Sequence, residues 1–166
     1  DGTTAWYEND GSSDPSFTYR SIGTTDGSQG IHIADLDSDG DLDIVVASYN
    51  DDTIIWYENY GDFYSNNNWA YRRITNNANG AHHVYVGDLD NDGDLDVVSA
   101  SQIDDSITWY ENYGTDPRFT TGTDITTSAD GAQDVHIADL DGDGDLDIIS
   151  ASGFDNTIAW YENDGA

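Results

Sequence analysis

The 166-residue chain contains no cysteine, no methionine and no lysine, and only two prolines. Without cysteine, the fold cannot depend on a framework of disulfide bonds. Its 4 basic side chains stand against 34 acidic ones, which gives a net charge of −30 at pH 7. So acidic a surface makes nucleic acids and anionic membranes poor partners. Cations, carbohydrates and basic proteins are better ones.

Long apolar runs are also absent. No stretch is long enough to span a bilayer and none resembles a signal segment, so we expect no membrane span and interpret the chain as a mature protein or a fragment of a longer one. There is no nucleophile–base–acid set, no phosphate-cradling glycine loop and no redox motif. We therefore expect the protein not to be an enzyme.

Aspartate, by contrast, is abundant, and much of it lies in a nine-residue segment that occurs three times. Each copy has aspartate at positions 1, 3, 5, 7 and 9 and glycine at position 6. Clustered carboxylates repel one another unless a cation lies among them. Calcium accepts about six to eight oxygen ligands in a forgiving geometry, whereas magnesium demands a tight octahedron. The predicted calcium ligands are Asp35, Asp37, Asp39, Asp41 and Asp43; Asp88, Asp90, Asp92, Asp94 and Asp96; and Asp139, Asp141, Asp143, Asp145 and Asp147.

Within each loop, positions 1, 3, 5 and 9 are expected to offer carboxylates and position 7 a backbone carbonyl. Glycine allows the sharp bend at position 6. A helix-loop-helix calcium site would need Glu at position 12, but this chain has Val46, Ser99 and Ser150 there, within β-branched runs. The loop therefore joins two strands. A solvated acidic turn without metal is the alternative, but three copies in one register favour about three Ca²⁺ ions, one per loop.

A second motif, Trp-Tyr-Glu-Asn, occurs at residues 6–9, 56–59, 109–112 and 160–163, so one structural unit spans about 50 residues. In each complete unit we predict one strand before the acidic loop, one after it, and a third that carries the tetrad. The fourth strand is predicted at 17–22, 69–74 and 118–121, the segments that hold all four arginines. No amphipathic helical period occurs, so the predicted fold class is all-β.

Four strands in each unit indicate propeller blades. The Asp-x-Asp-x-Asp-Gly-x-x-Asp loop between apolar β runs resembles the FG-GAP/VCBS repeat family, whose blades form the heads of integrin α-subunits. This resemblance implies β-propeller-type blades of four antiparallel strands, with calcium bound by the loop positions given above. The Phe-Gly and Gly-Ala-Pro signatures of the family are absent, which leaves subfamily and partner open.

The chain is expected to form a single repeat array over 1–166, with about three blades and open ends. We predict a partial blade at 1–28, blades at 30–76 and 83–127, and a blade without its outer strand at 134–163. Exposed strand edges at both ends invite self-association or completion by a neighbouring chain. The array is either a window from a longer ring or a unit that assembles head to tail into a ring or filament.

These features predict an extracellular or cell-surface module with a structural or adhesion role, because calcium can replace disulfides where it is plentiful. A carbohydrate-binding lectin is the alternative, since tetrad aromatics can stack on sugars, although packing between blades explains the same residues. Side-chain packing is also the favoured role of His32, Tyr85 and His136, over a zinc site. The four tetrad glutamates are expected to make structural hydrogen bonds.

Overall fold

The computed structural model describes residues 2–61, 68–114 and 119–165, and all of its regular secondary structure is β. This confirms the predicted fold class. Within these residues no helix has the length and apolar character needed to cross a bilayer.

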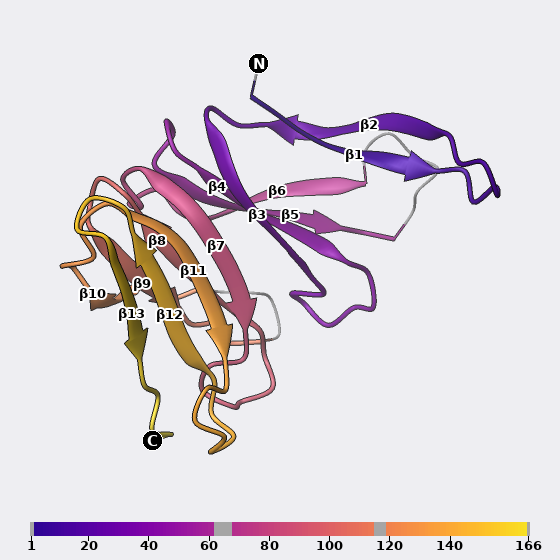
Figure 1. Cartoon of the computed structure of the whole chain (residues 1–166). Coiled ribbons are helices and arrows are strands. Elements are labelled where there is room, and N and C mark those ends of the chain that lie inside the picture. Colours follow the sequence, from indigo (N-terminus) through magenta and orange to yellow (C-terminus); the bar gives the residue numbers. More distant parts are fainter. Residues whose placement is uncertain (1, 62–67, 115–118, 166) are drawn as a thin grey trace.

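The strands form four antiparallel sheets that follow one another along the chain (Figure 1). The first is a hairpin, and the next three are blades in which each strand pairs with its sequence neighbour. The N-terminal hairpin contains β1 (Thr3–Asn9) and β2 (Phe17–Thr24); blade 1 contains β3 (Ser28–Ala34), β4 (Asp43–Ser48), β5 (Thr53–Asn59) and β6 (Trp69–Thr75); blade 2 contains β7 (Ala81–Gly87), β8 (Asp96–Ser101), β9 (Ser106–Tyr110) and β10 (Thr123–Thr126); blade 3 contains β11 (Ala132–Ala138), β12 (Asp147–Ser152) and β13 (Thr157–Tyr161).

Strands β4 and β8 are buried along their whole length, as is β5. The burial of β4 and β8 explains why their β-branched runs lack the polar alternation of a half-exposed strand. Each lies between the innermost strand of its blade and the tetrad strand.

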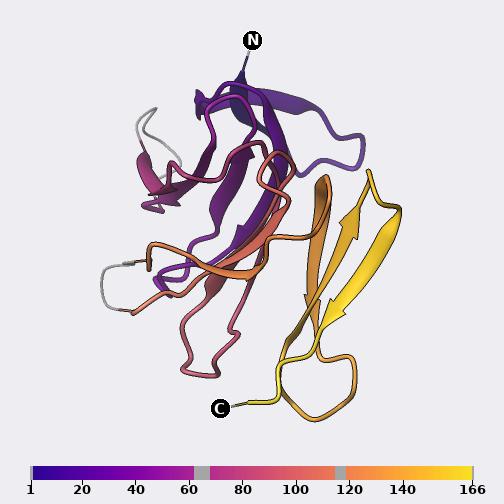
Figure 2. The same ribbon diagram turned by 90° about the vertical axis from the view of Figure 1, so that its left-hand side faces the viewer.

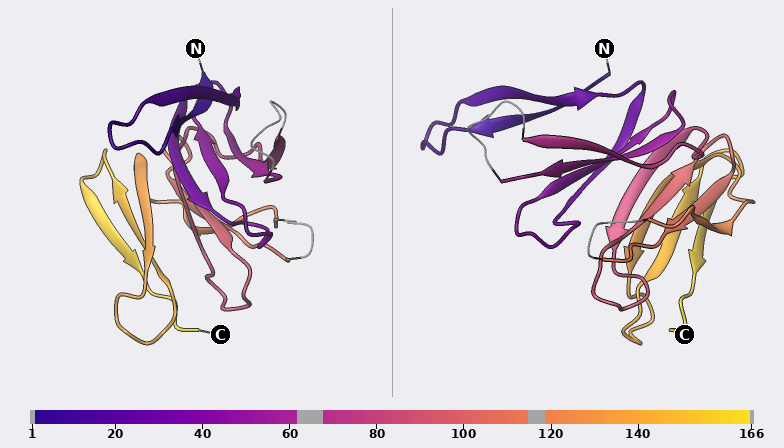
Figure 3. Two further views of the ribbon diagram at one scale, coloured as in Figure 1. Left: turned by 90° about the vertical axis from the view of Figure 1, so that its right-hand side faces the viewer. Right: turned by 180° about the vertical axis from the view of Figure 1, so that it is seen from behind.

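Consecutive blades pack face to face (Figures 2 and 3). We call the face of a blade that packs on the following blade its trailing face, and the face that receives the preceding blade its leading face. The trailing face of blade 1 includes Leu36, Ile54 and Trp56, and it contacts Val84 and Val86 on the leading face of blade 2. Blades 2 and 3 repeat this contact with Leu89, Val98, Ala100 and Ile107 against Val135, Ile137 and Ile148.

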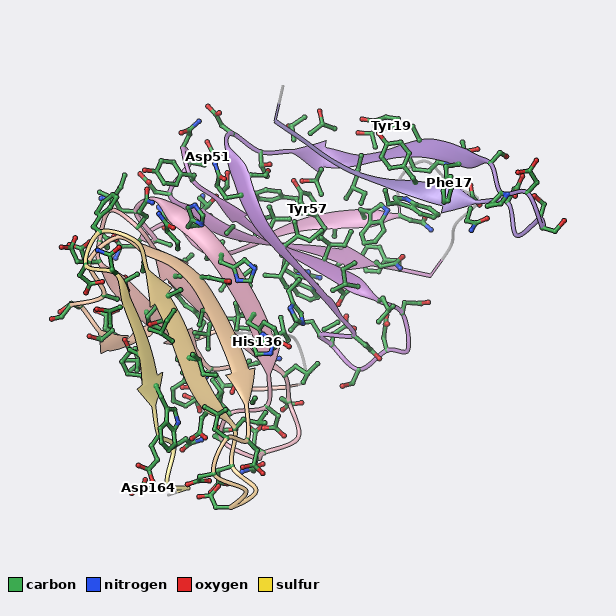
Figure 4. The ribbon with its side chains drawn as sticks, in the orientation of Figure 1. Phe17, Tyr19, Asp51, Tyr57, His136 and Asp164 are labelled. Carbon is green, nitrogen blue, oxygen red and sulfur yellow. The ribbon has the colours of Figure 1, made fainter. Side chains whose placement is uncertain are left out.

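The N-terminal hairpin matches the outer half of blade 1 in register. Trp6 pairs with Arg20 in the hairpin as Trp56 pairs with Arg72 between β5 and β6. The hairpin covers the outer part of the leading face of blade 1, where Tyr57 contributes to a third apolar cluster with Ile22 packed against it. Figure 4 shows Tyr57 lying below β2, which carries Phe17 and Tyr19.

The outer strand of blade 2 differs from the prediction. Residues 118–121 were expected to form it, but the observed strand is β10; Phe119 makes only an isolated bridge with Asn112, and Arg118 lies outside the described residues. The expectation followed the aromatic–arginine pattern of the other units. The observed pairing instead packs Ile125 against the core between blades 2 and 3 and lets the Thr108 hydroxyl donate to Asp124.

The innermost strands bring three rings into contact. His32 of β3 and His136 of β11 each lie 4.3 Å from Tyr85 of β7, measured between ring centroids. Burial lowers the pKa of His32, and the neighbouring His83 and His136 act in the same direction. The rings therefore pack across blades, as the sequence indicates.

Candidate metal sites

Each acidic loop connects the first and second strands of a blade, and its first aspartate organises the bend. The carboxylate of Asp35 accepts hydrogen bonds from the backbone N–H groups of Asp39 and Gly40, both at 3.0 Å. Asp88 accepts the same two bonds from Asp92 and Gly93. The backbone is left-handed at position 6, where Gly40, Gly93 and Gly144 have φ of 98°, 99° and 102°. Only glycine adopts such angles without strain, so the loop needs it there.

The carboxylates at positions 1, 3 and 5 converge in all three loops. In each loop one oxygen from each residue lies within 4.8 Å of the others. Across residues 2–61, 68–114 and 119–165, no other group of three or more potential His, Cys, Asp or Glu ligands comes together in this way. The nine residues are Asp35, Asp37 and Asp39; Asp88, Asp90 and Asp92; and Asp139, Asp141 and Asp143.

Like charges this close repel one another. The potential ligand atoms are all carboxylate oxygens, which suit a hard divalent cation. Burial raises the pKa of Asp37, and the charge of Asp39 raises it further. Asp90 shows the same direction, again mainly through burial. A cation among these oxygens would favour their charged forms. The residues present therefore fit a calcium ion.

The aspartates at position 7 are not members of these groups. The N–H of Asp41 donates to Asp39 Oδ1 at 2.9 Å, and Asp94 and Asp145 make the equivalent bonds. Asp145 also accepts a bond from Asn91 Nδ2 at 2.6 Å, which links the second loop to the third. That these residues offer a backbone carbonyl to the metal stays a prediction.

The aspartates at position 9 are buried beneath the loops and are already hydrogen-bonded. Asp43 Oδ2 accepts the N–H of Leu36 at 3.1 Å, and Oδ1 accepts the N–H of Asn59 at 2.8 Å. Burial raises the pKa of Asp43 and of Asp96 to about 6. Their role as metal ligands stays a prediction, while their observed contacts tie the loop to the tetrad strand. The same pair of bonds is made by Asp96 with Leu89 and Asn112, and by Asp147 with Leu140 and Asn163.

In blades 2 and 3 the asparagine of the tetrad hydrogen-bonds to the acidic loops of two consecutive blades. The sequence analysis did not predict this role. Asn112 Nδ2 donates to the carbonyl of Leu95 in its own blade and, at 3.4 Å, to Leu36 of the preceding blade. Asn163 likewise donates to Leu146 and, at 2.8 Å, to Leu89. A signal was present: the position-9 aspartate and the tetrad asparagine are 16 residues apart in every complete unit.

The tetrad glutamates make structural contacts in two units, as expected. Glu58 accepts from Arg72 Nε at 2.5 Å, and Glu8 accepts from Arg20. The two remaining histidines contact the next blade: His82 Nδ1 lies 2.7 Å from the carbonyl of Gln133, and His83 Nδ1 lies 3.0 Å from the Asp134 carboxylate.

Comparison with known families agrees with this arrangement. A model described as an FG-GAP-like repeat matches residues 1–46, 35–99 and 88–150. Each match ends within the strand that follows an acidic loop. No curated protein matches the chain. The three consecutive matches cover most of its length, and the chain belongs to the family of FG-GAP-like repeat proteins.

Proposed function

We propose that the chain is a calcium-stabilised repeat module of propeller type that serves outside the cell as a structural or adhesion unit. The observation that carries this proposal is the threefold convergence of aspartate carboxylates at equivalent points of three blades. Three divalent ions would cancel about six of the 30 net negative charges and join the strands on either side of each loop.

Two further features support the proposal. The chain has no cysteine, so in an oxidising environment metal binding would be its main cross-link. The FG-GAP-like repeat is a structural and binding repeat, and the converging carboxylates lie in exposed or half-exposed loops rather than in an enclosed cavity. A binding module accounts for this arrangement better than an enzyme does.

The test is removal of one site by replacing Asp90→Asn and Asp92→Asn together. At about 1 mM free calcium, a site with a Kd of about 0.1–1 mM contributes about 0.4–1.4 kcal/mol of stability. We expect thermal unfolding in calcium to shift down by a few degrees, with no such loss in chelator, where the variant also relieves repulsion. Calorimetric titration should show one fewer calcium bound.

A matched control replaces Asp14→Asn and Asp130→Asn, two exposed aspartates outside the loops, which changes the net charge equally. It should leave the calcium stoichiometry unchanged. An equal loss of stability with and without calcium in the loop variant would contradict the metal role.

A cavity beside the second loop favours carbohydrate binding as a second candidate function. It measures about 400 Å³, and Trp109 and Tyr161 line it together with Asp90, Asn91 and Glu162. Aromatic faces beside polar groups are what a sugar ring requires. Saturable binding on a glycan array that weakens with Asn91→Ala and Glu162→Ala would support a lectin, and binding to no glycan would argue against it.

A further inference from the structure

Neighbouring acidic loops share a hydrogen-bond donor. We number the loops and their candidate metal sites in chain order: 1 (35–43), 2 (88–96) and 3 (139–147). Asn112 Nδ2 donates to the carbonyl of Leu36 in loop 1 at 3.4 Å and to that of Leu95 in loop 2 at 3.0 Å. Its Oδ1 accepts the N–H of Gly114 at 3.2 Å, which fixes the direction of the amide. This side chain is 1% exposed and holds loops of two consecutive blades.

Both carbonyls belong to peptide groups that lead directly into a carboxylate of the loop. The carbonyl of Leu36 lies in the peptide unit that joins it to Asp37, at position 3. The carbonyl of Leu95 lies in the unit that joins it to Asp96, at position 9, whose Oδ1 also accepts the backbone N–H of Asn112 at 2.8 Å. Because a peptide unit is planar, fixing its oxygen limits the directions available to the next residue. Asn112 therefore links the orientation of a carboxylate in loop 1 to that of one in loop 2.

Loops 2 and 3 are joined twice. Asn163 Nδ2 donates to the carbonyl of Leu89 at 2.8 Å and to that of Leu146 at 3.2 Å, as Asn112 does one blade earlier. In addition, Asn91 Nδ2, at position 4 of loop 2, donates to Asp145 Oδ1, at position 7 of loop 3, at 2.6 Å. The connection between these two loops is therefore the stronger one.

Asn59 of blade 1 provides a comparison within the molecule. Its Nδ2 donates to the carbonyl of Leu42 in loop 1 at 3.1 Å, and its Oδ1 accepts the N–H of Gly61, so it contacts its own loop as Asn112 does. The hairpin that precedes blade 1 carries no acidic loop. Within the part of the chain that the structure describes, Asn59 therefore joins no second loop.

We propose that the tetrad asparagines of blades 2 and 3 are positioning residues that couple the metal sites, so that calcium bound at one site raises the affinity of the next. This inference rests on the proposed function, because it requires that the loops bind calcium. Carboxylates that converge on an ion restrict the backbone of their loop. The shared amide then restricts a peptide unit of the neighbouring loop, so the second binding event orders less of the chain than the first. Coupling between sites typically changes affinity about 5- to 150-fold.

Long-range electrostatics acts in the opposite direction. The chain has a net charge of −30, and each bound ion cancels two of these charges and weakens the attraction for the next ion. Salt screens this effect, with a Debye length of about 8 Å at physiological ionic strength, but screens hydrogen bonds through a buried side chain much less. We therefore expect the positive coupling to increase as salt is added.

The experiment follows each site separately by NMR during a calcium titration at high salt. In every loop the N–H of the position-6 glycine donates to the position-1 carboxylate, so the amide signals of these glycines report on their own sites: Gly40, Gly93 and Gly144. Asp90→Asn with Asp92→Asn removes site 2. This variant raises the net charge by two, as a bound calcium ion does, so its long-range electrostatics matches that of the chain with site 2 loaded.

Removal of site 2 should raise the calcium concentration at the midpoint for Gly40 at least about twofold, because a fivefold coupling between two equal sites lowers their common midpoint by its square root. Asn112→Ala should abolish this response. Asn59→Ala is the matched control: it loses the same contacts with its own loop, so the affinity of site 1 can fall, but the response to removal of site 2 should persist. A purely structural role of Asn112 would not separate these two variants.

The pair of loops 2 and 3 repeats the test on less buried side chains, where a folding defect is less of a concern. Asn163 is half-buried and Asn91 is exposed, and Gly142 already occupies the position of Asn91 in loop 3. Asn163→Ala should reduce the response of Gly144 to removal of site 2. Asn163→Ala together with Asn91→Gly should abolish it.

Calorimetric titration counts the bound ions and separates this inference from the proposed function. Three ions, with a Gly40 midpoint that removal of site 2 leaves unchanged, would overturn the coupling and leave the calcium role intact. A response that persists in Asn112→Ala, or that Asn59→Ala abolishes equally, would overturn the assignment to the shared asparagine. No uptake of calcium would overturn the proposed function and this inference with it.

Discussion

Blades 1 and 3 carry the same tetrad, yet the two blades differ in what surrounds it. Trp56 in blade 1 is 1% exposed because blade 2 covers it, whereas its counterpart Trp160 is 51% exposed at the end of the array. The repeat specifies the same side chain in both places. The neighbouring blade, rather than the repeat itself, decides whether that side chain belongs to a core.

The same contrast extends to the charges under the acidic loops. Burial raises the pKa of Asp43 and Asp96 to about 6, but the N–H of Asn163 holds the pKa of Asp147 below its usual value. All three carboxylates accept an equivalent pair of backbone hydrogen bonds. Asp43 and Asp96 differ from Asp147 because another blade follows theirs in the array. Its packing adds to the burial that disfavours the charged carboxylate. A neighbour therefore changes electrostatics as well as packing.

The largest expected effect separates the two tryptophans. Trp56→Ala should lower the free energy of unfolding by about 3–5 kcal/mol, because it leaves a cavity between blades 1 and 2. Trp160→Ala should cost less than about 1 kcal/mol, because about half of that side chain is already exposed. Urea unfolding in calcium measures both. Similar losses for the two variants would show that Trp160 is also covered.

A pH series on the calcium-free chain should separate the buried aspartates. Since the pKa of Asp96 is raised from 3.8 to about 6, the folded state binds its proton more tightly than the unfolded state does. This contribution makes the chain more stable at about pH 4 than at about pH 7, and it is lost as pH rises through about 6. Asp147, whose pKa is lowered, contributes with the opposite sign: its stabilisation is present above 3.8 and lost as pH falls below it.

The measurement is the melting temperature of the calcium-free chain at a series of pH values from about 4 to about 7. Asp96→Asn should reduce the increase in melting temperature on acidification. Asp147→Asn, which changes the charge equally, should not reduce it. Equal slopes for the two variants would contradict the assignment of the raised pKa to burial between blades.

The smallest expected effect concerns the ion pairs of the outer strands. Glu58 is buried beneath Arg72, so Arg72→Gln leaves a carboxylate with little solvent and should cost about 1 kcal/mol or more. Glu8 and Arg20 are both exposed in the hairpin, so Arg20→Gln should cost less than about 0.5 kcal/mol. Chemical denaturation in low salt tests the ranking. A larger loss for Arg20→Gln than for Arg72→Gln would contradict this ranking, because it would mean that the ion pair of the hairpin is the better buried of the two.

Much of the site could be predicted from the sequence, because the acidic loop is a local structure. Positions 1, 3 and 5 converge through hydrogen bonds within nine residues, and the glycine at position 6 is required by its own φ. The hydrogen bonds of Asn112 and Asn163 were not predicted, because each side chain joins loops of two different blades, and such contacts depend on how the blades pack. The strand β10 was misplaced because its pairing depends on where Ile125 packs, which the aromatic–arginine pattern does not reveal.

The sequence alone therefore determined the all-β repeat, the order of strands around each loop and the aspartates that gather there, because these follow from periodicity and short-range hydrogen bonding. Only the tertiary structure decided which copies of a repeated residue are buried, which carboxylates have raised pKa values and which apolar faces stay open. Burial depends on what lies opposite a side chain, and identical repeats meet different surroundings at the middle and at the ends of an array.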